Sequence, residues 1–79
     1  MTFEQIYQRP KKRSILVNGH STSISLEDNF WHAFCEKANM ENISINQLIT
    51  KIDMQRDGKC SLASAIRLYV LRSKNSQKF

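Results

Sequence analysis

Three serines alternate with larger side chains in the stretch GHSTSISLEDNFW, residues 19–31. Successive side chains of a β-strand point to opposite faces, so a strand here would have one hydroxyl face and one apolar face. The hydroxyl face would carry Ser21, Ser23 and Ser25, and the opposite face would carry Thr22, Ile24 and Leu26. Hydroxyls both donate and accept hydrogen bonds, so the first face suits water or a polar partner. The second face requires a hydrophobic core.

Charged side chains fall into three blocks along the 79 residues, which carry a net charge of +5. Residues 1–25 are basic, residues 26–57 are acidic, and residues 58–79 contain basic residues and no acidic one. The densest cluster is Lys11, Lys12 and Arg13, directly after Pro10. Such a cluster can serve solubility or form an electrostatic footprint for nucleic acid or an acidic partner. Charge alone slightly favours solubility.

The remaining reactive residues do not form a recognisable catalytic or metal-binding pattern. Cys35 and Cys60 are the only cysteines and lack a C-x-x-C spacing, which argues against a disulfide framework or a zinc site and fits a reducing cytoplasm. His20 and His32 are not at metal-ligand spacing. No glycine-rich phosphate loop, nucleophile with a base, or transmembrane run is present. We therefore expect no enzyme activity, no cofactor, no bound metal and no membrane partner.

The elements that must position these residues begin with a β-hairpin. Residues 14–17 are apolar and β-branched, and the Asn18-Gly19 dipeptide favours a type I′ turn into the alternating strand. We expect residues 1–11 to form a flexible basic arm, residues 12–73 to form one domain, and residues 74–79 to form a frayed tail. Two strands alone are marginal in water, so helices or another ribbon must cover the apolar face.

Three helices are predicted after the hairpin. The first runs to near Met40, with Ser25 and Asp28 at capping-box spacing. Ser44 and Gln47 repeat that spacing before a second helix, which ends before Gly58. The third begins at residue 61 and is apolar around most of its circumference, which predicts that it is largely buried. Because one short chain buries only a marginal core, we expect a homodimer.

This order of elements resembles the ribbon-helix-helix DNA-binding proteins, the class of the Arc and Met repressors. The residues that carry the resemblance are TSISLEDNFWHAFCEKANMENISINQLITKI, residues 22–52. With KRSILVNG before them and SLASAIRLYVLR after them, the chain is similar to a short bacterial subfamily that has an extra N-terminal strand and an added C-terminal helix. The resemblance implies a mainly α fold with a small β-ribbon, built as an intertwined homodimer.

The resemblance also implies a function, transcriptional regulation by binding double-stranded DNA. In that family a double-stranded ribbon enters the major groove, and the N-terminus of the second helix binds a phosphate. Carried over, the base contacts would be Ser21, Ser23 and Ser25. The phosphate contacts at the second helix would be Ser44, Ile45 and Asn46, and the basic residues Lys11, Lys12 and Arg13 would add further phosphate contacts.

An alternative function is a dimeric scaffold that binds a small acidic ligand or a partner protein, with weak or lost DNA binding. Serine is short and discriminates poorly among bases, whereas family members commonly place longer side chains on this face. Arg67 lies among apolar residues and needs a partner, for which Asp53, Glu27 and a ligand carboxylate are the candidates. A structural ion pair is the simpler interpretation of Arg67, and an effector ligand stays a candidate partner.

Overall fold

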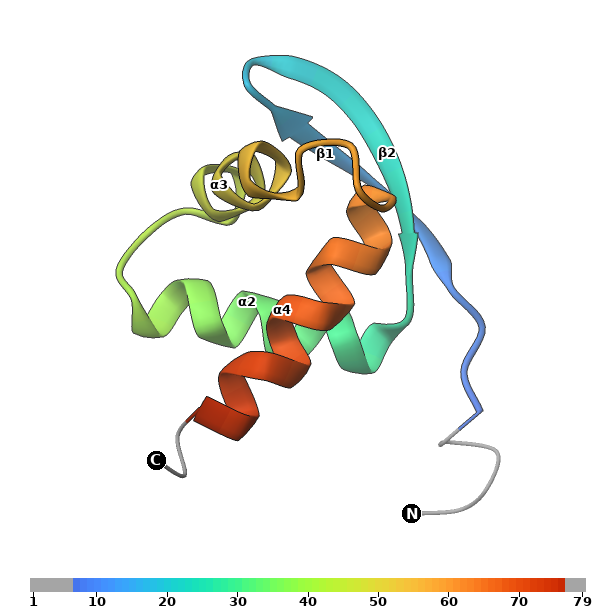
Figure 1. The fold of residues 1–79 in the computed structure, drawn as a ribbon. Coiled ribbons are helices and arrows are strands. Elements are labelled where there is room, and N and C mark those ends of the chain that lie inside the picture. The colour runs from blue at the N-terminus through green and yellow to red at the C-terminus, as the bar shows by residue number, and fades with distance from the viewer. Residues whose placement is uncertain (1–6, 77–79) are drawn as a thin grey trace.

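The computed structural model describes residues 7–76, in which a two-stranded sheet is followed by three helices. Figure 1 shows the hairpin lying over the helices, with the last helix crossing the first. The fold is mainly α with a small β-ribbon, as the sequence predicts. No helix within residues 7–76 has the length and apolar character needed to cross a membrane.

The sheet is an antiparallel hairpin of β1, Lys11–Val17, and β2, His20–Leu26. The register places Val17 opposite His20, which leaves the two-residue loop Asn18-Gly19. Asn18 and Gly19 have φ values of 51° and 82°, the left-handed backbone that a type I′ turn requires and that asparagine and glycine tolerate best. The hairpin prediction is therefore confirmed.

The helices follow the predicted order. They are α2, Asp28–Met40; α3, Ile45–Arg56; and α4, Leu62–Ser76. The predicted capping box at the start of α3 is present, because the Ser44 hydroxyl accepts from the Gln47 N–H and the Gln47 side chain accepts from the Ser44 N–H. Helix α3 ends where Asp57 adopts left-handed backbone with φ 48°.

The predicted capping box at the start of α2 is wrong. Ser25 remains inside β2, and the N-cap position is Glu27, whose side chain makes no capping hydrogen bond. The strand continues through Leu26 because this side chain is fully buried and anchors the end of the ribbon in the core. Asp28 is the first helical residue and still complements the positive end of the helix dipole.

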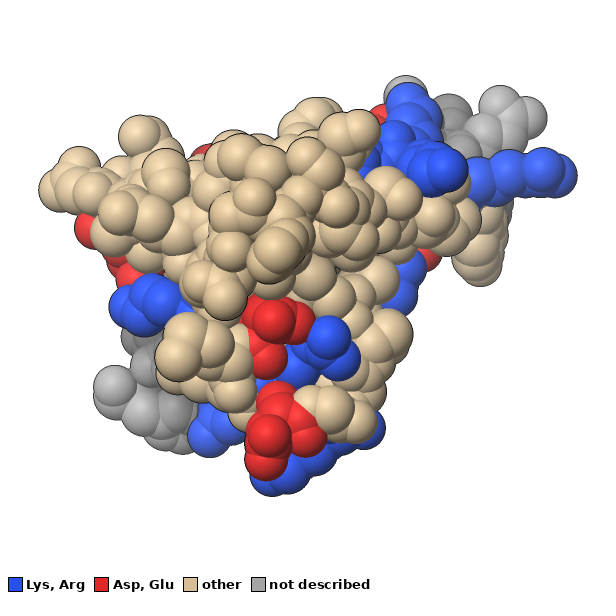
Figure 2. All heavy atoms as spheres, turned by 90° about the horizontal axis from the view of Figure 1, so that it is seen from above, with Lys and Arg blue, Asp and Glu red and all other residues tan. Residues whose placement is uncertain are grey.

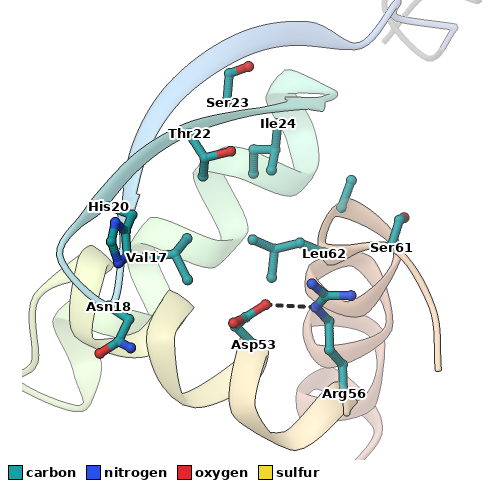
Figure 3. A pocket seen from close by; sticks show the side chains of 11 residues that line it. Val17, Asn18, His20, Thr22, Ser23, Ile24, Asp53, Arg56, Ser61 and Leu62 are labelled. Carbon is teal, nitrogen blue, oxygen red and sulfur yellow. Dashed lines mark hydrogen bonds and ion pairs between the residues drawn. The ribbon is translucent and has the colours of Figure 1, made fainter. Parts of the chain in front are cut away.

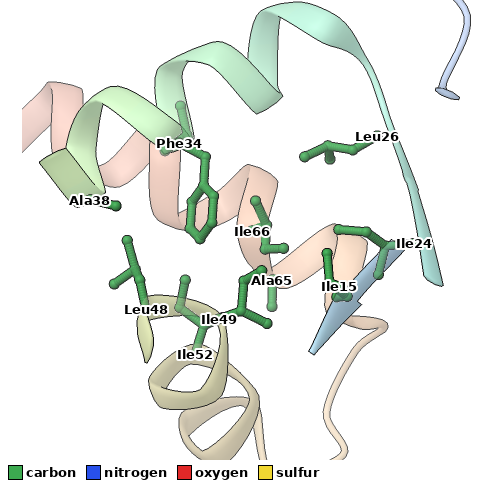
Figure 4. Close-up of a cluster of buried hydrophobic side chains, with 11 residues drawn as sticks. Ile15, Ile24, Leu26, Phe34, Ala38, Leu48, Ile49, Ile52, Ala65 and Ile66 are labelled. Atoms are coloured by element: carbon green, nitrogen blue, oxygen red, sulfur yellow. The ribbon is translucent and has the colours of Figure 1, made fainter. Parts of the chain in front are cut away.

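One hydrophobic core joins the hairpin to all three helices (Figure 4). Its fully buried large side chains come from different elements: Leu26 from β2, Phe34 from α2, Ile49 from α3 and Ile66 from α4. The core therefore closes within a single described chain. The homodimer expected from a marginal core therefore has to be inferred from other features of the molecule.

Helix α4 is less buried than its composition predicts. Its buried face carries Ala65, Ile66 and Val70, whereas Leu68 and Leu71 are 60% and 50% exposed. Of the predicted terminal segments, residues 1–6 of the arm and residues 77–79 of the tail lie outside the described residues. The last residue of the predicted arm, Lys11, begins β1, and α4 includes residues 74–76 of the predicted tail.

Candidate functional site

The face of the hairpin that points away from the helices holds the three predicted serines. Ser21, Ser23 and Ser25 are exposed and lie on the opposite face of β2 from the buried Ile24 and Leu26. The register adds a second row from β1, because Ser25, Ser23 and Ser21 pair with Lys12, Ser14 and Leu16. We call these six exposed residues the outer face of the hairpin.

Ser14 and Leu16 of this row are the part of the site that the sequence analysis missed, whereas Lys12 was expected as a phosphate contact. The Asn-Gly turn fixes the register, so counting back from it would have placed Lys12, Ser14 and Leu16 beside the serines. Figure 2 looks down on the hairpin: its surface is largely uncharged, and basic side chains gather at one end. The outer face is thus neutral at its centre, with its one charge at Lys12.

The three residues of the predicted basic cluster have different environments. Arg13 points inward and is half-buried: its guanidinium donates to the Leu26 carbonyl at 3.1 Å, pairs with Asp28, and lies 5.1 Å from the Trp31 ring centre. The Lys11 ammonium lies 2.9 Å from the other Asp28 oxygen. Hydrogen bonds from Lys11 and then Arg13 hold the pKa of the Asp28 carboxyl below its ordinary value. Within residues 7–73, Lys12 forms no ion pair and remains the cation directed outward.

The N-terminus of α3 lies beside the hairpin. The capping box engages the N–H groups of Ser44 and Gln47, both at 3.0 Å. Helix geometry leaves the N–H groups of Ile45 and Asn46 without intrahelical acceptors, at the positive end of the helix dipole. Asn46 also contacts the hairpin, because its Oδ1 accepts from the Leu16 N–H at 3.4 Å. The predicted phosphate-binding turn and the outer face are therefore joined directly.

Two hollows lie on either side of Leu16. One, of about 510 Å³, follows the outer face and is lined by Ser14, Leu16, Ser21, Ser23 and Asn46 among others. The second, of about 550 Å³, separates the hairpin turn from α3, and Leu16 and Ile43 are its larger apolar side chains.

The two edges of the hairpin differ. Side chains of α3 cover the turn end of the β1 edge, since Asn46 accepts from Leu16 N–H and the Thr50 hydroxyl accepts from Asn18 N–H at 3.1 Å. On β2, Arg67 donates to the Ser25 carbonyl at 3.5 Å, at one end of the edge. In an antiparallel pair, the N–H and C=O groups of every second residue point away from the partner strand. The backbone groups of Ser21 and Ser23 therefore face the same outer edge of β2 as those of Ser25. Among the described strands, none pairs with this edge.

A third hollow, of about 590 Å³, opens beside that free edge of β2 (Figure 3). Residues from the hairpin and from the start of α4 line it, including Thr22, Ile24 and Leu62. The ion pair between Asp53 and Arg56 forms the floor of this hollow, with Arg56 Nε 2.8 Å from Asp53 Oδ1. An apolar and partly polar hollow at an unpaired strand edge is suited to contact with another protein chain.

The residues considered for a ligand site instead form ion pairs within the chain. Arg67 binds Glu27, with Nε 2.9 Å from Oε1, and its guanidinium lies 5.9 Å from the Phe30 ring centre. This hydrogen bond is the main reason why the pKa of Glu27 is lowered. Asp53 binds Arg56 and is not brought to Arg67. In the described part of the chain, no group of three or more His, Cys, Asp or Glu residues could hold a metal ion.

A contact between α4 and the α2–α3 turn has no counterpart in the sequence analysis. The Tyr69 hydroxyl donates to Glu41 Oε2 at 2.8 Å. The pKa of Tyr69 is raised to about 12, mainly by burial of the hydroxyl and also by the Glu41 carboxylate. Two residues 28 positions apart cannot be paired from a single sequence without knowing how the helices cross.

Comparison with known proteins adds one finding to this geometry. A protein-family model described as a ribbon-helix-helix domain matches residues 10–73, most of the chain. No curated protein and no solved structure matches the chain.

Proposed function

The chain belongs to the ribbon-helix-helix family, and from this premise we propose that it is a dimeric, cytoplasmic regulator of transcription that binds double-stranded DNA. The outer face of the hairpin would approach the major groove, and the first turn of α3 would bind a phosphate. The observation that carries the proposal is that Asn46, in the first turn of α3, accepts from the Leu16 N–H at 3.4 Å, so the two surfaces lie side by side.

A second copy would complete the ribbon at the free edge of β2. The backbone groups of Ser21 and Ser23 face that edge, and two β2 strands could pair antiparallel about a two-fold axis near Ser23. The partner would also cover the hollow beside Ile24 and Leu62. The edge of β1 is less suited to this role because Asn46 and Thr50 already bond to its turn end.

The width of such a sheet decides which residues meet the bases. Neighbouring strands lie about 4.8 Å apart, so a sheet of four strands is wider than the major groove, which is about 12 Å across. The two central β2 strands would enter the groove with their serines, and each β1 would lie along a groove wall, where its outward side chains lie between the base edges and the phosphates. Lys12, on the outer side of β1, would then lie near the phosphate backbone, whereas Lys11 and Arg13 stay at Asp28.

The α3 N-terminus would supply the second backbone contact. A phosphate oxygen can accept from the N–H groups of Ile45 and Asn46 and gains from the helix dipole. The Asn46 side chain uses Oδ1 toward Leu16, which leaves its NH₂ group as a further donor. Contacts of this kind orient the protein on DNA without selecting a sequence.

A gel-shift titration with random-sequence duplex DNA over a salt series tests the proposal. We expect binding that weakens as salt rises, with a log–log slope of roughly −0.9 for each phosphate contacted. A protein that is folded and dimeric but binds no duplex at low salt would contradict the DNA-binding function. It would favour the alternative of a scaffold for a ligand or a partner protein.

A further inference from the structure

One apolar side chain interrupts the outer face of the hairpin. Of the six residues there, Leu16 is the only one without a hydroxyl or a charge, and it is 42% exposed. It lies opposite Ser21, at the end of the face that is farthest from Lys12. The neighbouring inward positions, Ile15 and Val17, already supply the core from this part of β1.

Leu16 lies between the first turn of α3 and the hydroxyl-bearing part of the outer face. Its N–H donates to Asn46 in the first turn of α3, and the hollow along the outer face runs from it past Ser14, Ser21 and Ser23. Leu16 therefore stands between the residues proposed to face the bases and the turn proposed to hold a phosphate. Its exposed aliphatic side chain is therefore placed where it could contact what the outer face binds.

The chemistry of base edges limits what the outer face can distinguish. A serine hydroxyl both donates and accepts, so it fits several bases. The thymine methyl is the apolar group that base edges present in the major groove. Resting on the proposed function, we propose that Leu16 is a specificity-determining residue that packs against a thymine methyl, once in each half of a two-fold symmetric site.

The size of the effect follows from burying one methyl group per contact. Removing that methyl should weaken binding about fourfold, and removing two related by the two-fold axis about fifteenfold. These factors apply to the methyl alone, because replacing thymine by uracil leaves the hydrogen-bonding groups of the base unchanged.

The test begins with selection of a binding site from a random duplex pool by the full chain. The enriched duplex is then resynthesised with deoxyuridine at each thymidine, and its affinity is compared for wild type, Leu16→Ala and Leu16→Met. Leu68→Ala is the matched control, since Leu68 is an exposed leucine on α4, outside the outer face. Circular dichroism confirms that each variant is folded.

We expect two symmetric thymines in the selected site and a loss of about fifteenfold on uracil substitution for wild type, Leu16→Met and Leu68→Ala. Leu16→Ala should lose less than about twofold. A selected site whose affinity is the same with uracil would overturn the role of Leu16 and leave the DNA-binding function standing. An equal loss in wild type and Leu16→Ala would also overturn it, because another residue would then contact the methyl. Failure of the wild type to bind any duplex would contradict the proposed function and this inference with it.

Discussion

Arg67 holds Glu27 with two parallel hydrogen bonds, from Nε to Oε1 at 2.9 Å and from Nη2 to Oε2 at 3.2 Å. Glu27 lies between β2 and α2, and Arg67 lies in α4, so this contact ties the added helix to the junction at which the ribbon becomes helical. A planar guanidinium matches a carboxylate in this geometry, and lysine does not.

Acid should remove the contribution of this contact to stability. The pKa of Glu27 is lowered from 4.5 mainly by Arg67, so the unfolded chain takes up the proton first and acid favours unfolding. Glu27→Gln should lower the free energy of unfolding by about 1 kcal/mol at pH 7, where solvent screens the pair. The difference from wild type should shrink as the pH falls below 4.5. Urea unfolding of both proteins between pH 7 and pH values below 4.5 measures this difference. A difference that stays the same at every pH would show that the charge of Glu27 is not its cause.

Lys12 and Arg13 should have separable effects, although they are neighbours in the sequence. Lys12→Ala should change the free energy of unfolding by less than about 0.5 kcal/mol. It should also make the slope of log K against log salt shallower by roughly 1.8, because a dimer loses two phosphate contacts. Arg13→Ala should instead cost about 1 to 2 kcal/mol of unfolding free energy, since it removes hydrogen bonds to Leu26 and Asp28. Urea unfolding and gel shifts over a salt series measure the two quantities. Equal slopes for Lys12→Ala and wild type would exclude Lys12 as a phosphate contact.

Proline substitutions should show which edge of the hairpin pairs with a second copy. Ser23 and Ser14 lie opposite each other, but their N–H groups face the edges of β2 and β1 respectively. Ser23→Pro removes a donor from the free edge, whereas Ser14→Pro, the matched control, removes one from the other edge. By sedimentation, we expect Ser23→Pro to be monomeric and Ser14→Pro to remain dimeric, with circular dichroism showing that both are folded. A dimeric Ser23→Pro would place the interface elsewhere.

Local signals were sufficient to predict the hairpin and the approximate positions of the helices. Asn18-Gly19 specifies a tight turn, and the Ser44–Gln47 pair specifies a helix start, because both devices act within a few residues. The Ser25–Asp28 pair has the same spacing, but it does not form a capping box. Burial of Leu26 keeps the chain extended there, and burial depends on the whole fold.

The candidate site was predictable on one strand only. Alternation placed the serines of β2 on a shared face, and Glu27 was one of three candidate partners of Arg67, but the sequence could not choose among them and gave no partner for Arg13, which binds 15 residues away. Such pairings depend on how elements cross in space, which periodicity does not encode. The sequence therefore presented Arg13 as part of a basic cluster, although its side chain stabilises the junction between the ribbon and α2.

Adding a cation to the outer face should strengthen DNA binding if that face lies in the major groove. Ser21 is exposed and stands away from the proposed two-fold axis near Ser23, so Ser21→Arg would not place two like charges opposite each other in the dimer. Two added guanidinium groups should raise affinity roughly tenfold or more at low salt and steepen the salt slope by roughly 1.8. His32→Arg adds the same charge at an exposed position on α2, outside the outer face, and should change affinity far less. Gel shifts of both variants against one duplex make the comparison. Equal gains from the two would mean that only net charge matters and that the hairpin does not face the DNA.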